Sequence, residues 1–211
     1  MKPDVKVKPH YWDRAKRALA RNDPVMAAII RRHPRVHLEP RGEPFHTLAR
    51  AIVGQQISVA AAQSVWNRFL TEVSVVLPEQ VLKAKTKDLR ACGLSERKVE
   101  YISDLAQRFA DGAVHVHRWP GMDDEEVIAD LVQVRGIGRW TAEMFLMFNL
   151  LRPDVFPLGD LGLQKGLRAA YHGGRKISLK TMQSRGETLR PWRSVATWYL
   201  WRSLDPVPVE Y

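Results

Sequence analysis

The 211-residue chain has few of the features that mark a secreted, metal-binding or membrane-spanning protein. It contains one cysteine, Cys92, which excludes an intrachain disulfide and a cysteine-based metal cluster. Its seven histidines are scattered and show no zinc-ligand spacing. No uninterrupted apolar run approaches the ~18–20 residues that span a bilayer. Residues 1–10 lack the apolar core of a signal peptide. We therefore expect a cytoplasmic protein.

Negative charge is also in short supply. The chain has 23 acidic residues against 33 lysines and arginines, which leaves a formal net charge of +10. Such an excess favours a polyanionic partner, and nucleic acid is the commonest one. On composition alone, an anionic membrane surface and a soluble protein that is simply basic both stay open. The hydrophobic fraction of 45% is enough to bury a substantial core, in one large domain or two small interleaved ones.

Strand patterns are nearly absent. Val73–Leu77 has some strand propensity, but over a short length. From Tyr11 onward, apolar residues recur at helical spacing between turn and capping residues, which predicts an all-α protein of about ten helices. The helices are expected near residues 24–30, 45–53, 58–70, 78–84, 86–91, 95–111, 123–132, 139–150, 160–170, 179–187 and 191–204.

The most informative segment is Val134–Thr141, which reads Val-Arg-Gly-Ile-Gly-Arg-Trp-Thr. Two glycines between amphipathic stretches predict a helix-hairpin-helix, although a Gly-Xaa-Gly turn also serves as a plain helix cap. Gly136 and Gly138 would let the backbone approach another molecule closely. The amides that open the second helix would attract a phosphate. With the lone carboxylate of Asp160 further along, the pattern suggests chemistry on a nucleic acid.

Four segments in this order resemble the helix-hairpin-helix DNA glycosylase superfamily, and more closely its 3-methyladenine DNA glycosylase II branch. Between residue 45 and about residue 204, the matching segments are Ala51–Ala61, Gly136–Ala142, Phe156–Asp160 and Pro191–Ser194. The resemblance implies two interleaved helical subdomains with the active site in the cleft between them. We expect residues 1–44 to pack with the C-terminal helices, 45–150 to hold the hairpin, and 151–211 to carry the catalytic loop. The N-terminal β domain of the reference enzyme is expected to be missing.

The resemblance implies a glycosylase that flips alkylated bases, such as 3-methyladenine and 7-methylguanine, out of duplex DNA and hydrolyses their N-glycosidic bonds in base excision repair. Asp160 matches the family's catalytic aspartate, whose charge stabilises the positive sugar that forms as the bond breaks. An aspartate there is also a common N-cap, and both roles can hold at once. Trp140 stands where bifunctional members carry a nucleophilic lysine. We therefore expect a monofunctional hydrolase without lyase activity.

The expected base pocket is built from Trp140, Trp201 and Met144. An indole face attracts a cationic alkylated purine by a cation–π interaction worth roughly 0.5–2 kcal/mol. Trp201 belongs to a run of aromatic residues, and aromatics at helical spacing are more often core. Arg202 replaces an aromatic of the family, so the resemblance implies a pocket that is more open or differently tuned.

Gln56 matches the family's wedge, the side chain that fills the gap left by a flipped base. The alternative is a corner glutamine that satisfies loose backbone groups. No cofactor is expected to be required, but the backbone carbonyls of Val132, Val134 and Ile137 match a family site for Na⁺ or K⁺. Other expected DNA contacts are Gln55, Ser58, Gly136, Gly138, Arg139, Thr141 and Lys165.

Two alternative functions stay open on the sequence. A non-catalytic helix-hairpin-helix module would bind DNA without needing Asp160 or Trp140. A monofunctional glycosylase for mismatched or deaminated bases would share most of the same residues. For the leading hypothesis we expect a monomer that binds double-stranded DNA and no membrane, associated with the nucleoid if the protein is bacterial.

Overall fold

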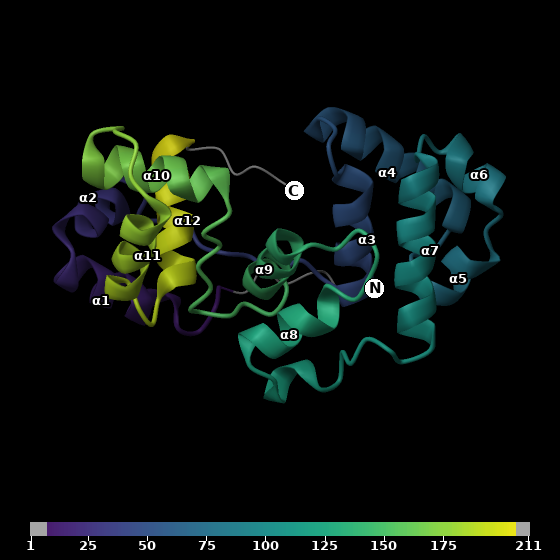
Figure 1. Ribbon diagram of the computed structural model, residues 1–211, viewed down its shortest axis with the longest axis horizontal. Coiled ribbons are helices and arrows are strands. Elements are labelled where there is room, and N and C mark those ends of the chain that lie inside the picture. The colour runs from purple at the N-terminus through teal and green to yellow at the C-terminus, as the bar shows by residue number, and fades with distance from the viewer. Residues whose placement is uncertain (1–7, 206–211) are drawn as a thin grey trace. The chain divides into compact units, whose positions relative to one another are not determined.

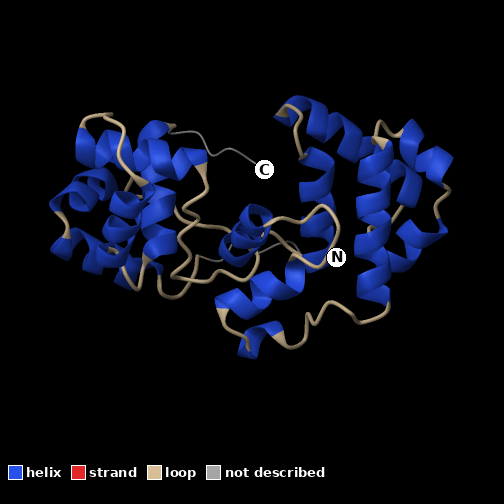
Figure 2. Ribbon diagram, viewed as in Figure 1, coloured by secondary structure: helices blue, strands red, loops and turns tan. Residues whose placement is uncertain are grey.

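The computed structural model describes residues 8–205, in which helices are joined by loops and there is no strand (Figure 2). The all-α prediction is confirmed. No helix in this range is long and apolar enough to cross a membrane. The described helices are α1 (Trp12–Asn22), α2 (Pro24–Arg32), α3 (Pro44–Gly54), α4 (Val59–Val73), α5 (Pro78–Lys83), α6 (Thr86–Ala91), α7 (Glu96–Ala110), α8 (Asp124–Leu131), α9 (Arg139–Phe148), α10 (Leu161–His172), α11 (Leu179–Thr188) and α12 (Arg193–Leu204), with a short 3-10 helix at Trp119–Gly121.

The expected helix boundaries need small corrections. The short strand considered for Val73–Leu77 does not form, because Val73 ends α4 and the next residues turn into α5. The helix expected from residue 191 begins at Arg193, since Trp192 has φ −120° and ψ 32° and stands outside the helix. The first helix, α1, has no counterpart among the predicted ranges.

Side-chain caps start many of the helices, as polar residues before an apolar stretch predict. Asp23 Oδ1 accepts the amides of Val25 and Met26 at the start of α2. Ser58 Oγ accepts the amide of Ala61 at 3.3 Å, which makes Ser58 the N-cap of α4. The start of α8 is a capping box, in which Asp123 and Glu126 each accept the other's amide. Each of these bonds gives a hydrogen-bond acceptor to an amide that has no partner within the helix.

The chain divides into two compact units. Within the described residues, one unit comprises 8–40 and 146–205, and the other comprises 41–145. The three-part division expected at residues 44 and 150 stays a prediction, and residues 1–7 of its first part and 206–211 of its third lie outside the described range.

In the unit formed by the two ends of the chain, α12 is the central helix. It packs against α1, α2 and α10, and Figure 1 shows the yellow α12 among the purple α1 and α2 and the green α10. Val195, Ala196, Tyr199 and Leu200 of α12 are fully buried. A helix that is covered on nearly every side loses its amphipathic pattern. The long run of aromatic and apolar residues here is therefore largely core.

The second unit packs α3 and α5 against the long helix α7. A buried carboxylate joins its last segments. Asp130 of α8 is 4% exposed and accepts the amide of His115 at 2.9 Å and the indole N–H of Trp119 at 2.7 Å. His115 Nδ1 lies 2.8 Å from the other carboxylate oxygen. These bonds hold the loop after α7 against α8, the helix that leads into the hairpin.

We predict that Asp130→Asn lowers the free energy of unfolding by roughly 2 kcal/mol, because the amide cannot accept all three bonds of the buried site. Burial raises the pKa of Asp130, but the bonds from His115 and Trp119 outweigh it and the net pKa is lowered. The carboxylate therefore stabilises the fold at pH values above its ordinary pKa, and this contribution is lost as the pH falls through the lowered value. Urea unfolding at neutral and acidic pH checks both points, with the exposed Asp111→Asn as the control. An equal loss in the control would contradict the assignment.

Candidate active site

Asp160 stands at the N-terminus of α10 and is 7% exposed. Its Oδ1 accepts the amide of Leu163 at 2.6 Å, so the residue is an N-cap, as its position in the sequence suggests. The same Oδ1 accepts the indole N–H of Trp201 at 2.8 Å. A helix turn and a side chain from α12 therefore orient one carboxylate together, at the positive end of a helix dipole.

Trp201 and Asp160 lie together in one unit. The indole of Trp201 stacks on Phe148 at the end of α9, with ring centroids 6.1 Å apart and planes inclined by 10°. Trp198, one turn earlier on α12, meets Trp201 edge-on at 6.4 Å and is buried. Trp201 is only partly buried, so the run of aromatics divides into a core member and a member at the carboxylate.

Gly162 allows this arrangement. A Cβ at this position would lie 3.1 Å from Asp160 Oδ1 and 3.1 Å from two indole atoms of Trp201. A residue with a Cβ would force the carboxylate or the indole to shift by a few tenths of an ångström. Sequence reasoning missed Gly162, although a glycine in the first turn of a helix carries a propensity cost of roughly 1 kcal/mol and needs an explanation.

The hairpin between α8 and α9 forms as the two glycines predict, but each glycine has a different reason. Gly136 has φ +85°, and a Cβ there would meet the Tyr101 ring of α7 at 2.2 Å. Glycine is therefore required by the fold itself. Gly138 has no positive φ, and a Cβ there would meet nothing within 4 Å. Packing within the chain does not explain Gly138, whereas close approach of a bound molecule would.

Trp140 and Met144 lie four residues apart on α9 and share one face of that helix. Trp140 is in the first turn and is 39% exposed, which is high for an indole, while Met144 is 7% exposed. The two expected pocket residues are thus adjacent within the hairpin unit. The expected cleft that would join them to Asp160 and Trp201 stays a prediction, because the two pairs belong to different units.

The two glutamines in the corner between α3 and α4 point to different tasks. Gln55 Nε2 donates to the carbonyl of Gly136 at 2.8 Å and thereby braces the corner against the hairpin. Gln56 is exposed and has φ +58°, a left-handed conformation that costs a non-glycine residue roughly 1–2 kcal/mol. A strained backbone at an exposed residue is a feature of functional sites. Gln55 thus satisfies a backbone group, and the wedge role of Gln56 stays a prediction.

The remaining expected DNA contacts differ in their surroundings. Arg139 forms two hydrogen bonds with Glu125 of α8 and one with Glu143 of α9, so its charge is partly neutralised. Its pKa is raised, chiefly by the bond with Glu125. Thr141 is 8% exposed, which leaves its backbone amide in the first turn of α9 as the group that a phosphate could use. Lys165 is exposed on α10.

The three carbonyls matched to a cation site lie at the hairpin. Val132 is the C-cap of α8, and the last carbonyls of a helix have no hydrogen-bond partner within it. The carbonyl of Val134 accepts the Ile137 amide at 3.0 Å and retains a second lone pair. Neutral oxygens of this kind fit a hard monovalent cation. Within residues 8–205, no group of three or more histidine, cysteine, aspartate or glutamate side chains could hold a metal ion.

Comparison with known proteins identifies the family of this architecture. Residues 49–191 match the model of the HhH-GPD superfamily base excision DNA repair protein. DNA-3-methyladenine glycosylase 1 of Schizosaccharomyces pombe is 33% identical over 76% of this chain and 72% of its own length. The putative DNA-3-methyladenine glycosylase YfjP of Bacillus subtilis is 30% identical over 85% of this chain and 66% of its own length.

Solved structures give the same result. The crystal structure of a DNA-3-methyladenine glycosidase from Bacillus halodurans superposes with a TM-score of 0.77 at 33% identity, covering 87% of this chain and 90% of that one. The Schizosaccharomyces pombe 3-methyladenine DNA glycosylase Mag1, in complex with abasic DNA, superposes with a TM-score of 0.76 at 29% identity. The match covers 93% of this chain and 100% of that one.

We predict that Gly136→Ala lowers the free energy of unfolding by roughly 2–4 kcal/mol, because it combines a disfavoured φ with an overlap on the Tyr101 ring. Chemical denaturation measures the change. Gly121→Ala is the matched control, since a Cβ at Gly121 meets nothing within 4 Å and its φ is not positive. A Gly136→Ala protein as stable as this control would show that the hairpin does not depend on glycine.

Proposed function

This chain belongs to the HhH-GPD superfamily of base excision DNA repair proteins, and on that premise we propose that it is a monofunctional DNA glycosylase that excises alkylated bases from duplex DNA. The observation that carries the proposal is the Asp160 carboxylate, buried at a helix N-terminus and oriented by the Leu163 amide and the Trp201 indole. Relatives that share this architecture are named DNA-3-methyladenine glycosylases. Their name supports 3-methyladenine and similar lesions as the substrate class.

The chemistry follows from the carboxylate. As the C1′–N bond breaks, its electron pair leaves with the base, and an alkylated base that carried a positive charge departs as a neutral molecule. The sugar becomes oxocarbenium-like, and the negative charge of Asp160 stabilises it. A water molecule then adds at C1′ and loses a proton, which leaves an abasic site and a free base. Because the cationic base is already a good leaving group, the enzyme needs to lower the activation barrier by less.

Recognition of the base is assigned to Trp140, Met144 and Trp201. The Trp140 side chain is 39% exposed, and a cationic purine placed over an indole gains roughly 0.5–2 kcal/mol. Tryptophan has no amine, so it cannot form a Schiff base with the sugar. We therefore propose hydrolysis without strand cleavage, with an intact abasic strand as the product.

Duplex DNA is held, in this proposal, by the hairpin and the corner that Gln55 braces against it. The exposed Gln56 enters the stack and occupies the space of the flipped base. Amides at the start of α9 bind a backbone phosphate, a contact that sets register without reading sequence. The carbonyls of Val132, Val134 and Ile137 would hold Na⁺ or K⁺, which would add positive charge beside that phosphate. Mag1, solved with abasic DNA, supports DNA as the partner.

We predict that Asp160→Asn slows base release by about 100-fold or more, because an amide carries no charge to stabilise the sugar cation. Asparagine is an equally good N-cap, so the fold should persist. The assay is chromatographic detection of 3-methyladenine and 7-methylguanine released from dimethyl-sulfate-treated duplex DNA under single-turnover conditions. Asp111→Asn, an exposed change at the residue after α7, controls for the loss of an acidic group.

The same assay separates the competing functions. Release by the parent protein with the product strand uncut until alkali is added agrees with a monofunctional glycosylase. Salt-sensitive binding with no release, in the parent and in Asp160→Asn alike, would instead indicate a DNA-binding module. Duplexes with a single mismatched or deaminated base test the third possibility.

We also predict opposite effects of Gln56→Gly on stability and on activity. Glycine accepts φ +58° freely, so the free energy of unfolding should rise by up to about 1 kcal/mol. Base release should slow on the order of tenfold, because nothing then fills the vacated stack. Ser74→Gly is the matched control, since Ser74 also has φ +58° but lies beyond the end of α4. A Gln56→Gly enzyme that keeps the parent rate would remove the wedge assignment.

A further inference from the structure

The segment Pro191–Ser194 has no role in the chemistry described so far, yet it makes dense contacts at the start of α12. Ser194 is fully buried, at 0% exposure. Its hydroxyl accepts the amide of Val155 at 2.9 Å and donates to the carbonyl of Arg152 at 2.6 Å, and its amide donates to the carbonyl of Pro153 at 3.0 Å. Ser194 therefore fixes the backbone of residues 152–155.

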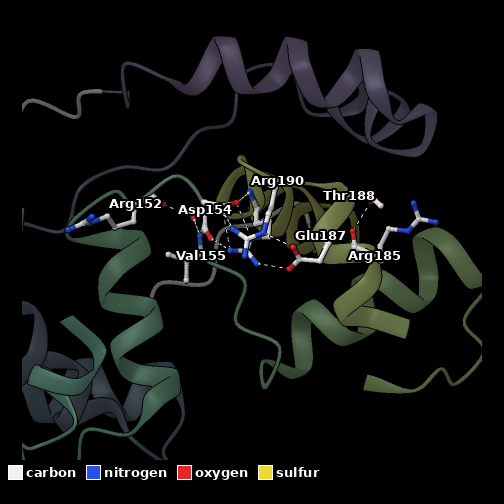
Figure 3. A network of polar contacts seen from close by, with 9 residues as sticks. Arg152, Asp154, Val155, Arg185, Glu187, Thr188 and Arg190 are labelled. Atoms are coloured by element: carbon white, nitrogen blue, oxygen red, sulfur yellow. Dashed lines mark hydrogen bonds and ion pairs between the residues drawn. The ribbon is translucent and has the colours of Figure 1, made fainter. Parts of the chain in front are cut away.

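Arg193 also fixes this stretch, because its side chain bonds Asp154. Figure 3 shows the network of polar contacts around Asp154, Arg190 and Glu187. The Arg193 Nε donates to Asp154 Oδ1 at 2.9 Å, and its Nη2 donates to Asp154 Oδ2 at 3.0 Å and to the Asp154 carbonyl at 2.8 Å. The Arg193 side chain is 15% exposed and that of Asp154 is 19% exposed. A two-point bond between a planar guanidinium and a carboxylate, largely shielded from water, defines an orientation as well as a distance.

Arg190 and Glu187 extend the network outward. Arg190 bonds Asp154 Oδ2 and Glu187 Oε2, each at 2.7 Å, but both side chains are about half exposed, at 49% and 52%. Exposed ion pairs contribute little. The effective part of the network is therefore Asp154, Arg193 and Ser194, which we call the clamp.

A short, braced path leads from the clamp to Asp160. The Phe156 ring lies on Gly186 of α11, where a Cβ would come within 2.5 Å of it. The carbonyl of Leu158 accepts the side-chain amide of Gln164 at 2.9 Å, and the amide of Asp160 donates to the carbonyl of Pro157 at 2.8 Å. These contacts hold the residues between Val155 and Asp160 in turns.

We propose that Arg193 and Ser194 are positioning residues, which place the Asp160 carboxylate by anchoring residues 152–155. This inference rests on the proposed function, because it gives the Pro191–Ser194 segment a task in that reaction. The physical reason is that an electrostatic stabiliser works only when it is held at the reacting atom. A displacement of about 1 Å can cost roughly 100-fold in rate. DNA binding by the hairpin unit does not depend on the clamp.

The test compares Ser194→Ala and Arg193→Gln with the parent protein. Both variants are expected to release alkylated bases about 10- to 100-fold more slowly in single turnover, while the enzyme concentration that half-saturates binding to the damaged duplex stays unchanged. Hydrogen–deuterium exchange should increase at the amides of 156–163, including the Leu163 amide that Asp160 accepts. Arg193→Lys keeps the charge without the two-point bond and should recover only part of the rate.

Thr197→Val is the matched control. Thr197 lies one turn further along α12 and is equally buried, but its hydroxyl has no hydrogen-bond partner. Its removal tests the loss of a buried hydroxyl from the same helix without touching residues 152–155. The control should keep the parent rate and the parent exchange pattern. All proteins are assayed well below their measured unfolding midpoints, so that a lower stability does not reduce the rate.

The outcomes separate the two proposals. Parent-like rates in Ser194→Ala and Arg193→Gln, or losses matched by Thr197→Val or accompanied by equal losses of DNA binding, would overturn the positioning role. If the parent released no alkylated base, the proposed function would fail. The exchange experiment would then still decide whether the clamp holds the Asp160 turn, because unchanged exchange at Leu163 in Ser194→Ala would refute that.

Discussion

Two hydrogen bonds to one oxygen atom connect the fold of this protein to its proposed chemistry. The Leu163 amide and the Trp201 indole both donate to Asp160 Oδ1. The first bond starts α10, and the second ties that start to α12, the central helix of its unit. A carboxylate that caps a helix is held in place by the same interaction that stabilises the helix. The proposed catalytic group is therefore part of the scaffold.

This dependence explains why so much structure surrounds one short loop. Gly162 leaves room for Trp201 to reach the carboxylate, Phe148 supports the indole by stacking, and Gly186 makes space for Phe156. The Asp154–Arg193 pair and the Ser194 hydroxyl hold the loop at its origin. A preorganised charge needs little reorganisation during reaction, which is the source of most electrostatic catalysis. In the proposed reaction, this chain preorganises the Asp160 charge with small residues and buried polar hydrogen bonds.

The hairpin unit follows a different principle. Its parts are positioned by constraints on the backbone. Gly136 has a positive φ and packs against the Tyr101 ring, and the Gln55 side-chain amide donates to the Gly136 carbonyl. Two of the residues proposed to meet the substrate, Gln56 and Trp140, are exposed. Arg139 departs from this pattern, because Glu125 and Glu143 already bind it. A phosphate would compete with these carboxylates, so the contribution of Arg139 to binding is smaller than its charge alone implies.

The sequence by itself determined the helical class, the N-caps at Ser58 and Asp160, the hairpin and the family, because capping, periodicity and glycine turns depend on neighbours a few residues apart. Only through the resemblance did it also predict Trp201 as a pocket residue and Asp160 as the catalytic aspartate. Tertiary structure decided which tryptophan of α12 is core and which meets the carboxylate, and which of Gln55 and Gln56 turns inward. It also revealed the roles of Gly162, Arg193 and Ser194. Their partners lie across helices that are distant in sequence, and local patterns carry no record of such contacts.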